Sequence, residues 1–333
     1  MKAALYDTTG AARDVLKVTE AERPEPGPGQ VRVRVHASGI NPTDVKARSG
    51  AVPRPMDEFQ VPHQDGAGVI DAVGPGVDPS RVGQRVWVYL AAHGPESKWG
   101  TAAEWTVVPE QQAVPLPDGV DMEFGASLGV PAVTAHRCVF ADGPVTGKTV
   151  LVAGGAGAVG HFAVELAKWG GARVVATVSS ADKADLARQA GADLVVNYRE
   201  GDVAGQVRPF AERVDRVVEV ALTDNLETDL ALSGPQTVIV TYAAQPADPV
   251  LPVRKCMTAN VTLRFVLLYT LPAAALEQAA ADITTALRDG ALTPLPVHRF
   301  GLDDIVAAHE AAENGVTGKV VVAPGPGEPN KPG

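Results

Sequence analysis

The chain has little cysteine: only Cys138 and Cys256 among its 333 residues. Neither sits in a CxxC or CxxxC pair, which excludes a zinc ribbon or a disulfide framework and favours a reduced, cytoplasmic setting. The sequence also lacks an apolar run of the about 20 residues that a membrane span requires. Its first residues, MKAALYDTTG, lack the pattern of a signal peptide. We therefore expect a cytoplasmic protein without a membrane partner.

Basic residues are scarce as well. Lys and Arg number 29 against 39 Asp and Glu, which gives a formal net charge of −10. Nucleic acids and anionic membrane surfaces attract clustered Lys and Arg, and no such run is present, so we expect neither as a partner. Apolar residues make up 45% of the chain, which is typical of a globular protein, and the length allows two domains.

The first third of the chain predicts short strands. Val31, Val33 and Val35 alternate with polar residues, which is typical of a strand with one buried face. Turns rich in glycine and proline separate this strand from three others, expected at Ala67–Val73, Arg85–Leu90 and Ala103–Val108. Short strands with such turns predict a small barrel or sandwich.

The pattern changes near residue 121, where a helix is expected at Met122–Phe140. Strands are then predicted at Thr149–Ala153, Arg173–Val178, Leu194–Asn197, Arg216–Val220, Thr237–Tyr242 and Val261–Leu268. Helices are predicted at Val159–Trp169, Asp182–Ala190, Val203–Ala211 and Leu226–Leu232. This alternation predicts an α/β fold with a parallel sheet covered on both faces. The chain is then expected to form two more helices, at Ala273–Asp289 and Leu302–Glu313, followed by a strand at Lys319–Ala323 and a flexible tail from residue 325.

A glycine-rich turn joins the first strand of this α/β region to its helix. Gly155, Gly157 and Gly160 form GxGxxG, and the motif follows "TVLVAG" and opens "VGHFAVELAKW". In a dinucleotide-binding turn the first glycine allows a tight bend, the second admits a pyrophosphate and the third lets helix and strand pack closely. The N–H groups at the helix start, with Ala158 and Val159, would bind the phosphates. A turn without a ligand is the alternative, and the strand–turn–helix context favours the dinucleotide.

The end of the following strand selects the dinucleotide. NAD-binding folds usually place a carboxylate there to bind the ribose hydroxyls. This chain has Ser179 and Ser180 instead, and Lys183 lies one turn into the next helix. Two hydroxyls and a cation suit a 2′-phosphate, which favours NADPH. Asp182 fits the first helical turn, where a carboxylate interacts well with the helix dipole.

Several segments together resemble a known family. They are "ASGINPTDVKARSG" from Ala37, "DGAGVIDAVGPGV" from Asp65, "VGQRV" from Val82, "GVPAVTAHRCVF" from Gly129, the glycine turn, "GADLVVNYRE" from Gly191 and "GKVVV" from Gly318. In this order they resemble the zinc-independent quinone oxidoreductase branch of the medium-chain dehydrogenase/reductase superfamily.

The resemblance implies a GroES-like β-barrel catalytic domain over residues 1–121 and a doubly wound Rossmann domain binding NADPH over residues 122–262. It also implies a return to the catalytic domain over residues 263–324, with the active cleft between the two domains. Relatives are commonly dimers or tetramers that join Rossmann sheets edge to edge, so a homodimer is expected.

The resemblance also indicates that no metal is bound. Zinc-dependent relatives have cysteine, histidine and cysteine ligands where this chain has Asn41, Gln64 and Val130, none of which is a strong zinc ligand. The Cys-rich loop for structural zinc is absent too. His63 lies one position from the ligand position, and without thiolate partners we interpret it as a structural histidine.

The cofactor contacts that the resemblance implies are spread over the chain. Asn41 and Thr134 would flank the nicotinamide and act as positioning residues in catalysis. The remaining contacts would be Ser179, Ser180, Lys183 and Tyr198 at the 2′-phosphate, Tyr242, Phe265 and Leu267 at the nicotinamide and its ribose, and Lys319 from the last strand. The alternatives are an exposed turn residue for Tyr198 and core packing for Phe265.

This chain departs from its relatives at several positions. Relatives often carry a tyrosine near Val45-Lys46 and another near Ala51-Val52, so the stacking of a quinone is altered here. His136 is either a proton donor or, as we favour, a packed or surface histidine. His161 either helps to bind phosphate or is solvated.

Hydride transfer from NADPH to a quinone fits the sequence best. A quinone needs no metal, because its reduction gives an aromatic hydroquinone and water supplies the protons. The first alternative is reduction of an activated C=C bond in an enal, enone or enoyl thioester. The second is a non-enzymatic NADPH-binding protein. No residue is identified as a general acid.

Overall fold

The computed structural model describes residues 1–52, 56, 58–94 and 97–325. The chain divides into two compact units, one of Met1–Val130 with Pro296–Gly333 and one of Pro131–Leu295. The division falls within helix α3 (Met122–Phe140), at Pro131. Of the predicted flexible tail, residues 326–333 lie outside the described residues. In the described residues, no helix is long and apolar enough to cross a membrane.

The N-terminal unit contains the barrel-like sheet that the short strands predict. Its strand order is β14-β15-β3-β4-β5-β7, and β6 also pairs with β3. The strands are β3 (Gln30–Gly39), β4 (Asp65–Val73), β5 (Arg85–Val88), β6 (Trp105–Pro109), β7 (Ala113–Pro115), β14 (Val297–Gly301) and β15 (Lys319–Ala323). A separate antiparallel pair is formed by β1 (Lys2–Leu5) and β2 (Lys17–Glu20). The α-helices that lie wholly in this unit are α1 (Ala12–Val15), α2 (Pro42–Ser49) and α10 (Ile305–Glu313), and the first part of α3 belongs to it too.

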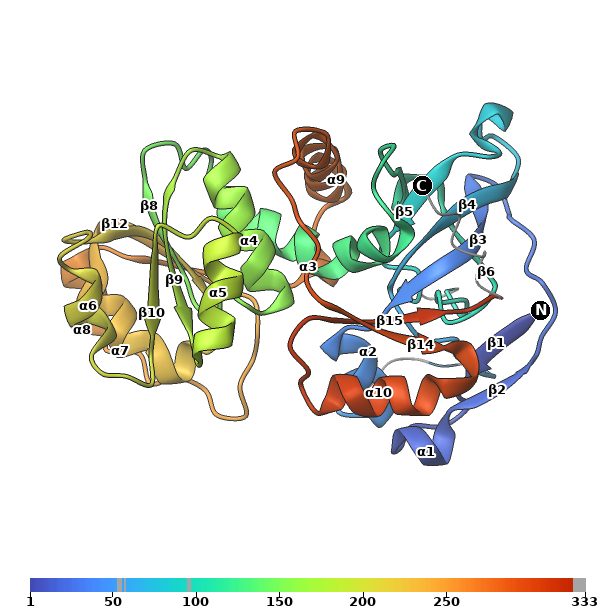
Figure 1. Ribbon diagram of the computed structural model, residues 1–333, viewed down its shortest axis with the longest axis horizontal. Helices are drawn as coiled ribbons and strands as arrows, with labels where there is room; N and C mark the ends of the chain where they lie inside the picture. Colours follow the sequence, from blue (N-terminus) through green and yellow to red (C-terminus); the bar gives the residue numbers. More distant parts are fainter. Residues whose placement is uncertain (53–55, 57, 95–96, 326–333) are drawn as a thin grey trace. The chain divides into compact units, whose positions relative to one another are not determined.

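Strand β3 is the centre of this sheet. Val31, Val33 and Val35 are buried, as their alternation predicts, and they pack with residues such as Ile70 and Val108. β3 pairs with β4 on one side and with β6 and β15 on the other. Strand β15 therefore lies beside β3 (Figure 1). Lys319, the first residue of β15, donates to the side chain of Asn41, which is the N-cap of α2.

The second unit is a six-stranded parallel sheet in the order β10-β9-β8-β11-β12-β13. The strands are β8 (Thr149–Val152), β9 (Arg173–Val178), β10 (Leu194–Asn197), β11 (Val214–Glu219), β12 (Ser233–Thr241) and β13 (Thr262–Phe265). Figure 1 shows α4 (Ala158–Trp169) and α5 (Ala181–Gln189) on one face of the sheet, and α6 (Val203–Val207), α7 (Leu222–Leu232) and α8 (Val253–Ala259) on the other. This is the doubly wound Rossmann order, and ligands of such sheets bind at the carboxyl ends of the strands.

The division of the chain differs from the expected one in its second half. Strand β13 pairs in parallel with β12 and is the sixth strand of the Rossmann sheet, and α9 (Ala273–Arg288) also belongs to this unit. The return to the N-terminal unit therefore begins at Pro296 rather than at residue 263. Helix α8 and strand β14 were not predicted, because both are short and their apolar residues show no clear period.

Candidate functional site

The glycine turn after β8 has the geometry of a dinucleotide cradle. Gly154 takes the left-handed conformation, with φ of 68°, so the tight bend lies one residue before the motif. A Cβ on Gly155 would meet the Cβ of Ala176 at 2.7 Å, and a Cβ on Gly160 would lie 2.2 Å from the carbonyl oxygen of Gly154. A Cβ on Gly157 would meet only this same oxygen, at 3.4 Å. Packing therefore requires glycine at positions 155 and 160, whereas position 157 has room.

Helix α4 begins directly after this turn. Gly157 is its N-cap and offers no side chain to the first turn. The N–H of His161 donates to the Gly157 carbonyl at 2.8 Å. The N–H groups of Ala158 and Val159 belong to the first turn, which has no helical acceptors, so they are available to an anion.

The tip of β9 brings four predicted residues together. Ser179 and Ser180 follow the strand, and Ser180 caps α5 by accepting a hydrogen bond from the Lys183 N–H at 3.4 Å. The Lys183 ammonium donates to Ser179 Oγ at 3.3 Å. Tyr198 follows the neighbouring strand, donates its N–H to the carbonyl of Val178 and is 49% exposed. Two hydroxyls, one ammonium and an exposed ring thus surround one strand end.

The other expected cofactor residues of this unit lie at further strand ends or in α3. Tyr242 follows β12, and burial raises the pKa of its phenol. Phe265 ends β13 and is 73% exposed, which excludes core packing within this unit, and Leu267 is 55% exposed. Thr134 lies in α3 and is buried.

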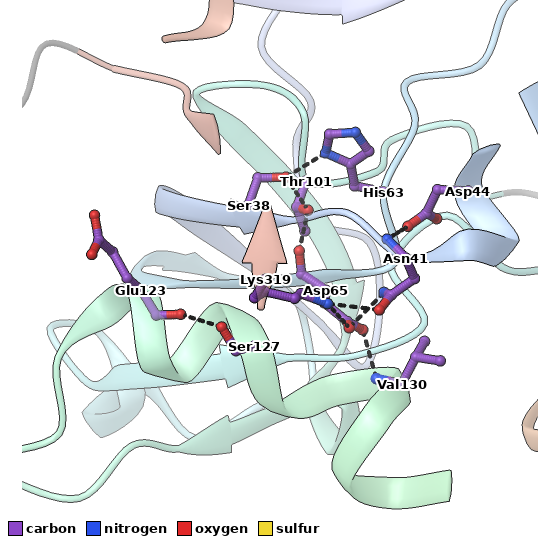
Figure 2. Close-up of polar contacts among 10 residues, drawn as sticks. All are labelled: Ser38, Asn41, Asp44, His63, Asp65, Thr101, Glu123, Ser127, Val130 and Lys319. Carbon is purple, nitrogen blue, oxygen red and sulfur yellow. Dashed lines mark hydrogen bonds and ion pairs between the residues drawn. The ribbon is translucent and has the colours of Figure 1, made fainter. Parts of the chain in front are cut away.

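A buried polar centre occupies the N-terminal unit (Figure 2). Asn41 donates from Nδ2 to Asp65 Oδ2 at 2.6 Å and accepts from the Lys319 ammonium at 2.6 Å. The ammonium lies 3.6 Å from the same carboxylate oxygen. All three side chains are at most 3% exposed. Burial lowers the pKa of Lys319 and raises that of Asp65, while each opposite charge acts against this effect.

The backbone around this centre leaves room for the Asp65 and Lys319 side chains. The N–H of Val130 donates to Asp65 Oδ1 at 2.8 Å, and a Cβ on Gly129 would lie 2.1 Å from that oxygen. A Cβ on Gly39 would lie 2.9 Å from Lys319 Cε. The resemblance named Asn41 and Lys319 as cofactor contacts but did not single out Asp65. Asp65 orients the amide of Asn41, because its carboxylate accepts from Nδ2 while Lys319 donates to the oxygen.

His63 belongs to a buried chain of hydrogen bonds that reaches the backbone carbonyl of Asp65 through Thr101. Its Nδ1 lies 2.7 Å from Ser38 Oγ, and its Nε2 lies 3.0 Å from His309 Nε2. Ser38 in turn contacts Thr101 Oγ1 at 2.7 Å (Figure 2). Burial holds the pKa of His63 well below its usual value, so the ring is neutral at pH 7. Both nitrogens are therefore engaged within the protein, as expected for a structural histidine.

The two histidines of the second unit are also packed. His136 is 1% exposed and its Nε2 lies 2.8 Å from Asp282 Oδ2, which agrees with the packed interpretation. His161 is 2% exposed and its Nε2 lies 3.0 Å from the carbonyl oxygen of Thr293 and 3.2 Å from Glu165 Oε1. The expectation of a solvated or phosphate-binding His161 therefore differs from the structure. Its ring fills the inner face of α4 and holds the segment after α9.

A buried carboxyl pair at the end of β11 was not found from the sequence. Glu219 and Asp229 are at most 1% exposed and hydrogen-bond to each other, and Glu219 also accepts from the Ala221 N–H and from Asn225. Burial, followed by the charge of Glu219, raises the pKa of Asp229 well above its usual value. Ionising two adjacent carboxyl groups is unfavourable, so Asp229 stays protonated and its O–H donates a hydrogen bond to Glu219.

Asp229→Asn is expected to stabilise the protein at alkaline pH. The folded protein binds a proton at this pair that the unfolded chain releases near pH 4, so wild-type stability falls as pH rises above that value. Asparagine donates without a proton to lose, which should raise the free energy of unfolding at pH 8 by about 1–3 kcal/mol and change it little below pH 4. Thermal unfolding at several pH values measures this. The control Asp185→Asn, on the surface of α5, should keep the wild-type dependence of stability on pH. If the stability of Asp229→Asn ran parallel to that of wild type at all pH values, the proposed proton on the Glu219–Asp229 pair would be contradicted.

The donor set for a metal is poor. Among the described residues, no three His, Cys, Asp or Glu side chains are grouped so that they could hold a metal ion. The family resemblance places Asn41, Gln64 and Val130 where zinc-dependent relatives carry ligands, and none of the three is a strong zinc ligand. The amide of Asn41 already contacts the Lys319 ammonium, whose charge would repel a cation at this place.

Comparisons with known proteins agree with this fold. The model of the alcohol dehydrogenase GroES-like domain matches residues 27–118, and that of the zinc-binding dehydrogenases matches residues 158–285. A quinone oxidoreductase of Pseudomonas aeruginosa is 32% identical over 320 residues, which cover 93% of this chain and 96% of that protein. A mycobacterial protein solved in complex with NADPH has a TM-score of 0.84 and 31% identity, covering 97% of this chain and all of the other. An NAD-dependent alcohol dehydrogenase has a TM-score of 0.87 and 28% identity, covering 98% of this chain and all of the other.

A GroES-like unit followed by a Rossmann sheet with a dinucleotide cradle defines a nicotinamide-dependent oxidoreductase. The chain belongs to the quinone oxidoreductase branch of the medium-chain dehydrogenase/reductase superfamily. It is thus an NAD(P)H-dependent oxidoreductase that acts on a small molecule.

Proposed function

We propose that this protein is an NADPH-dependent quinone reductase that works without a metal. The choice of NADPH as the cofactor rests on the residues at the tip of β9. Ser179 and Ser180 stand where an NAD-specific strand presents a carboxylate, and the Lys183 ammonium reaches Ser179. A 2′-phosphate gains charge-assisted hydrogen bonds there, and Tyr198 offers an exposed ring beside it.

The acceptor class is supported by the polar centre and by the relatives named as quinone oxidoreductases. A quinone accepts a hydride without a Lewis acid and takes its protons from water, so the protein need only bind and orient the reactants. Asn41 is held by Asp65 and Lys319 with a second Nδ2 hydrogen unused by Asp65. We assign this N–H, with the Thr134 hydroxyl, to positioning of the nicotinamide.

NADPH, when bound, supplies the hydride; the chain supplies the cradle and the orienting amide. The N–H groups of the first turn of α4 would bind the pyrophosphate, and Ser179 with Lys183 would hold the 2′-phosphate. A homodimer stays a prediction. Strand β13 lies at one edge of the Rossmann sheet and is bordered by the exposed side chains of Met257 and Phe265, which suits edge-to-edge pairing.

Ser179→Asp is expected to lower the preference for NADPH over NADH by about tenfold or more. The new carboxylate repels the 2′-phosphate and accepts from the ribose hydroxyls of NADH. Lys183→Ala should lower kcat/KM for NADPH by about tenfold and leave that for NADH unchanged. The control Lys255→Ala removes a lysine of α8 that pairs with Glu227 away from β9. Steady-state oxidation of the two cofactors measures each value, and a wild-type preference for NADH would refute the assignment.

The acceptor is tested by NADPH oxidation with a panel of quinones and of enals and enones. Turnover of quinones supports the proposal, and turnover of the C=C compounds alone would replace it with an enone reductase. Tight NADPH binding with no turnover on any acceptor would favour a non-enzymatic protein. Metal analysis of the active protein provides an independent check, because stoichiometric zinc would refute the metal-free assignment.

A further inference from the structure

The loop that follows β11 lies where the strand order of the Rossmann sheet reverses. Strands β8 and β11 are neighbours in the order β10-β9-β8-β11-β12-β13, and α4 and α7, which follow them, cover opposite faces of the sheet (Figure 1). Dinucleotides bind across the carboxyl edge of such a sheet at this point. The 2′-phosphate end is assigned to Ser179 at the tip of β9, so the nicotinamide half would extend to the other side of β8, over β11.

This loop packs against the glycine turn. The N–H of Ala153 donates to the carbonyl oxygen of Val218 at 2.9 Å, which aligns the two strand ends. A Cβ on Gly154 would meet Cγ1 of Val220 at 3.4 Å, an ordinary packing distance. Val220 is only partly buried, so it borders both the tight bend of the cradle and the space beyond the strand ends. The position of this loop therefore sets one wall of the dinucleotide site.

Glu219, the last residue of β11, holds the loop in place. Its fully buried carboxylate accepts hydrogen bonds at Oε1 from the backbone N–H of Ala221 and, at 3.0 Å, from Nδ2 of Asn225. Ala221 is the N-cap of α7, and its methyl group cannot cap the helix, so the carboxylate supplies the polar contact at this helix start. Asp229, from the third turn of the same helix, holds the carboxylate by the hydrogen bond described above.

We propose that Glu219 is a positioning residue for the cofactor, whose carboxylate fixes Val220 and Ala221 where they border the nicotinamide half of the dinucleotide. The inference rests on the proposed function in one respect, the placing of the adenosine end at β9. Glu219 acts through the loop, since its own side chain is fully buried. A carboxylate suits this role because one of its oxygens accepts from two donors at once.

The test compares two ligands by calorimetry. NADPH carries both halves of the cofactor, whereas adenosine 2′,5′-bisphosphate carries the adenosine and the 2′-phosphate without the nicotinamide. Glu219→Met removes the acceptor and should weaken NADPH about tenfold, while the affinity for the bisphosphate should stay within about twofold of wild type. Glu219→Gln keeps an oxygen that can accept from Ala221, so it should restore most of the NADPH affinity.

Thr237→Val is the matched control. Thr237 lies in β12 and is buried, and its hydroxyl donates to the carbonyl oxygen of Val214 at 2.7 Å and accepts from the N–H of Gly234 at 3.0 Å. The variant thus loses buried hydrogen bonds in the same pair of strands, but Val214 begins β11, at the end of the strand opposite to Glu219. We expect a lower melting temperature and a wild-type affinity for NADPH.

Equal weakening of NADPH and of the bisphosphate in Glu219→Met would assign Glu219 a general role in the fold and overturn the proposal. Wild-type affinity for NADPH in that variant would do the same, as would a Glu219→Gln variant that binds as weakly. Glu219→Met combined with Asp229→Leu carries the test if the single variant does not fold, since it leaves no unpaired carboxyl group. A wild type that does not bind the bisphosphate would instead refute the NADPH assignment, and the same comparison is then made with NADH and ADP.

Discussion

Lys319→Met is expected to lower kcat by about 100-fold and the free energy of unfolding by about 3–5 kcal/mol. The ammonium is 3% exposed, donates to Asn41 and lies beside the fully buried Asp65. Without it, Asp65 becomes an unpaired buried carboxylate, which must take up a proton or destabilise the fold. The amide of Asn41 also loses the donor that holds its oxygen. Chemical denaturation and steady-state kinetics measure the two effects.

A double variant separates folding from positioning. Lys319→Met with Asp65→Asn removes both charges, and asparagine still accepts the Val130 N–H, so most of the lost stability should return. Activity should stay low, because neither partner orients the Asn41 amide. A double variant as active as wild type would contradict the positioning role and would leave the pair a purely structural one.

The local parts of the fold were predictable from the sequence. The strand, turn and helix around Gly155 are contiguous, and the glycine spacing together with the flanking apolar segments indicates their order. The Ser179–Ser180–Lys183 grouping was equally accessible, since a serine cap and a lysine three residues later share one helical turn. Even here the sequence assigned the tight bend to Gly155, whereas Gly154 has the positive φ. Motif spacing locates a turn but does not say which residue carries the unusual conformation.

The polar centre was only partly predictable. Asn41 lies 24 residues from Asp65 and 278 from Lys319, and no periodicity links residues across such distances. The family resemblance supplied two of the three as separate cofactor contacts, and the sheet pairing of β15 with β3 joins them. The Glu219–Asp229 pair and the packing of His161 were not predicted, for the same reason. Burial of a polar residue depends on which distant segments cover it, and sequence pattern near the residue does not report this.

Gly157→Ala is expected to weaken dinucleotide binding by at least about tenfold while leaving the fold intact. Gly157 has φ of −77° and ψ of 162°, which alanine adopts freely. The new Cβ would meet only the Gly154 oxygen at 3.4 Å, an ordinary contact, so the melting temperature should stay the same or rise slightly. The methyl group would instead occupy the space through which a pyrophosphate approaches the helix start. Calorimetric titration with NADPH and a thermal melt measure the two quantities.

Gly160→Ala is the contrasting variant. Its Cβ would lie 2.2 Å from the Gly154 carbonyl oxygen, so the turn must open and stability should fall by about 1–3 kcal/mol along with dinucleotide affinity. The two variants thus separate the glycine that packing requires from the one that only a ligand requires. Wild-type affinity in Gly157→Ala would mean that the pyrophosphate does not approach this residue. A fall in melting temperature as large as that of Gly160→Ala would mean that position 157 serves the fold rather than the cofactor.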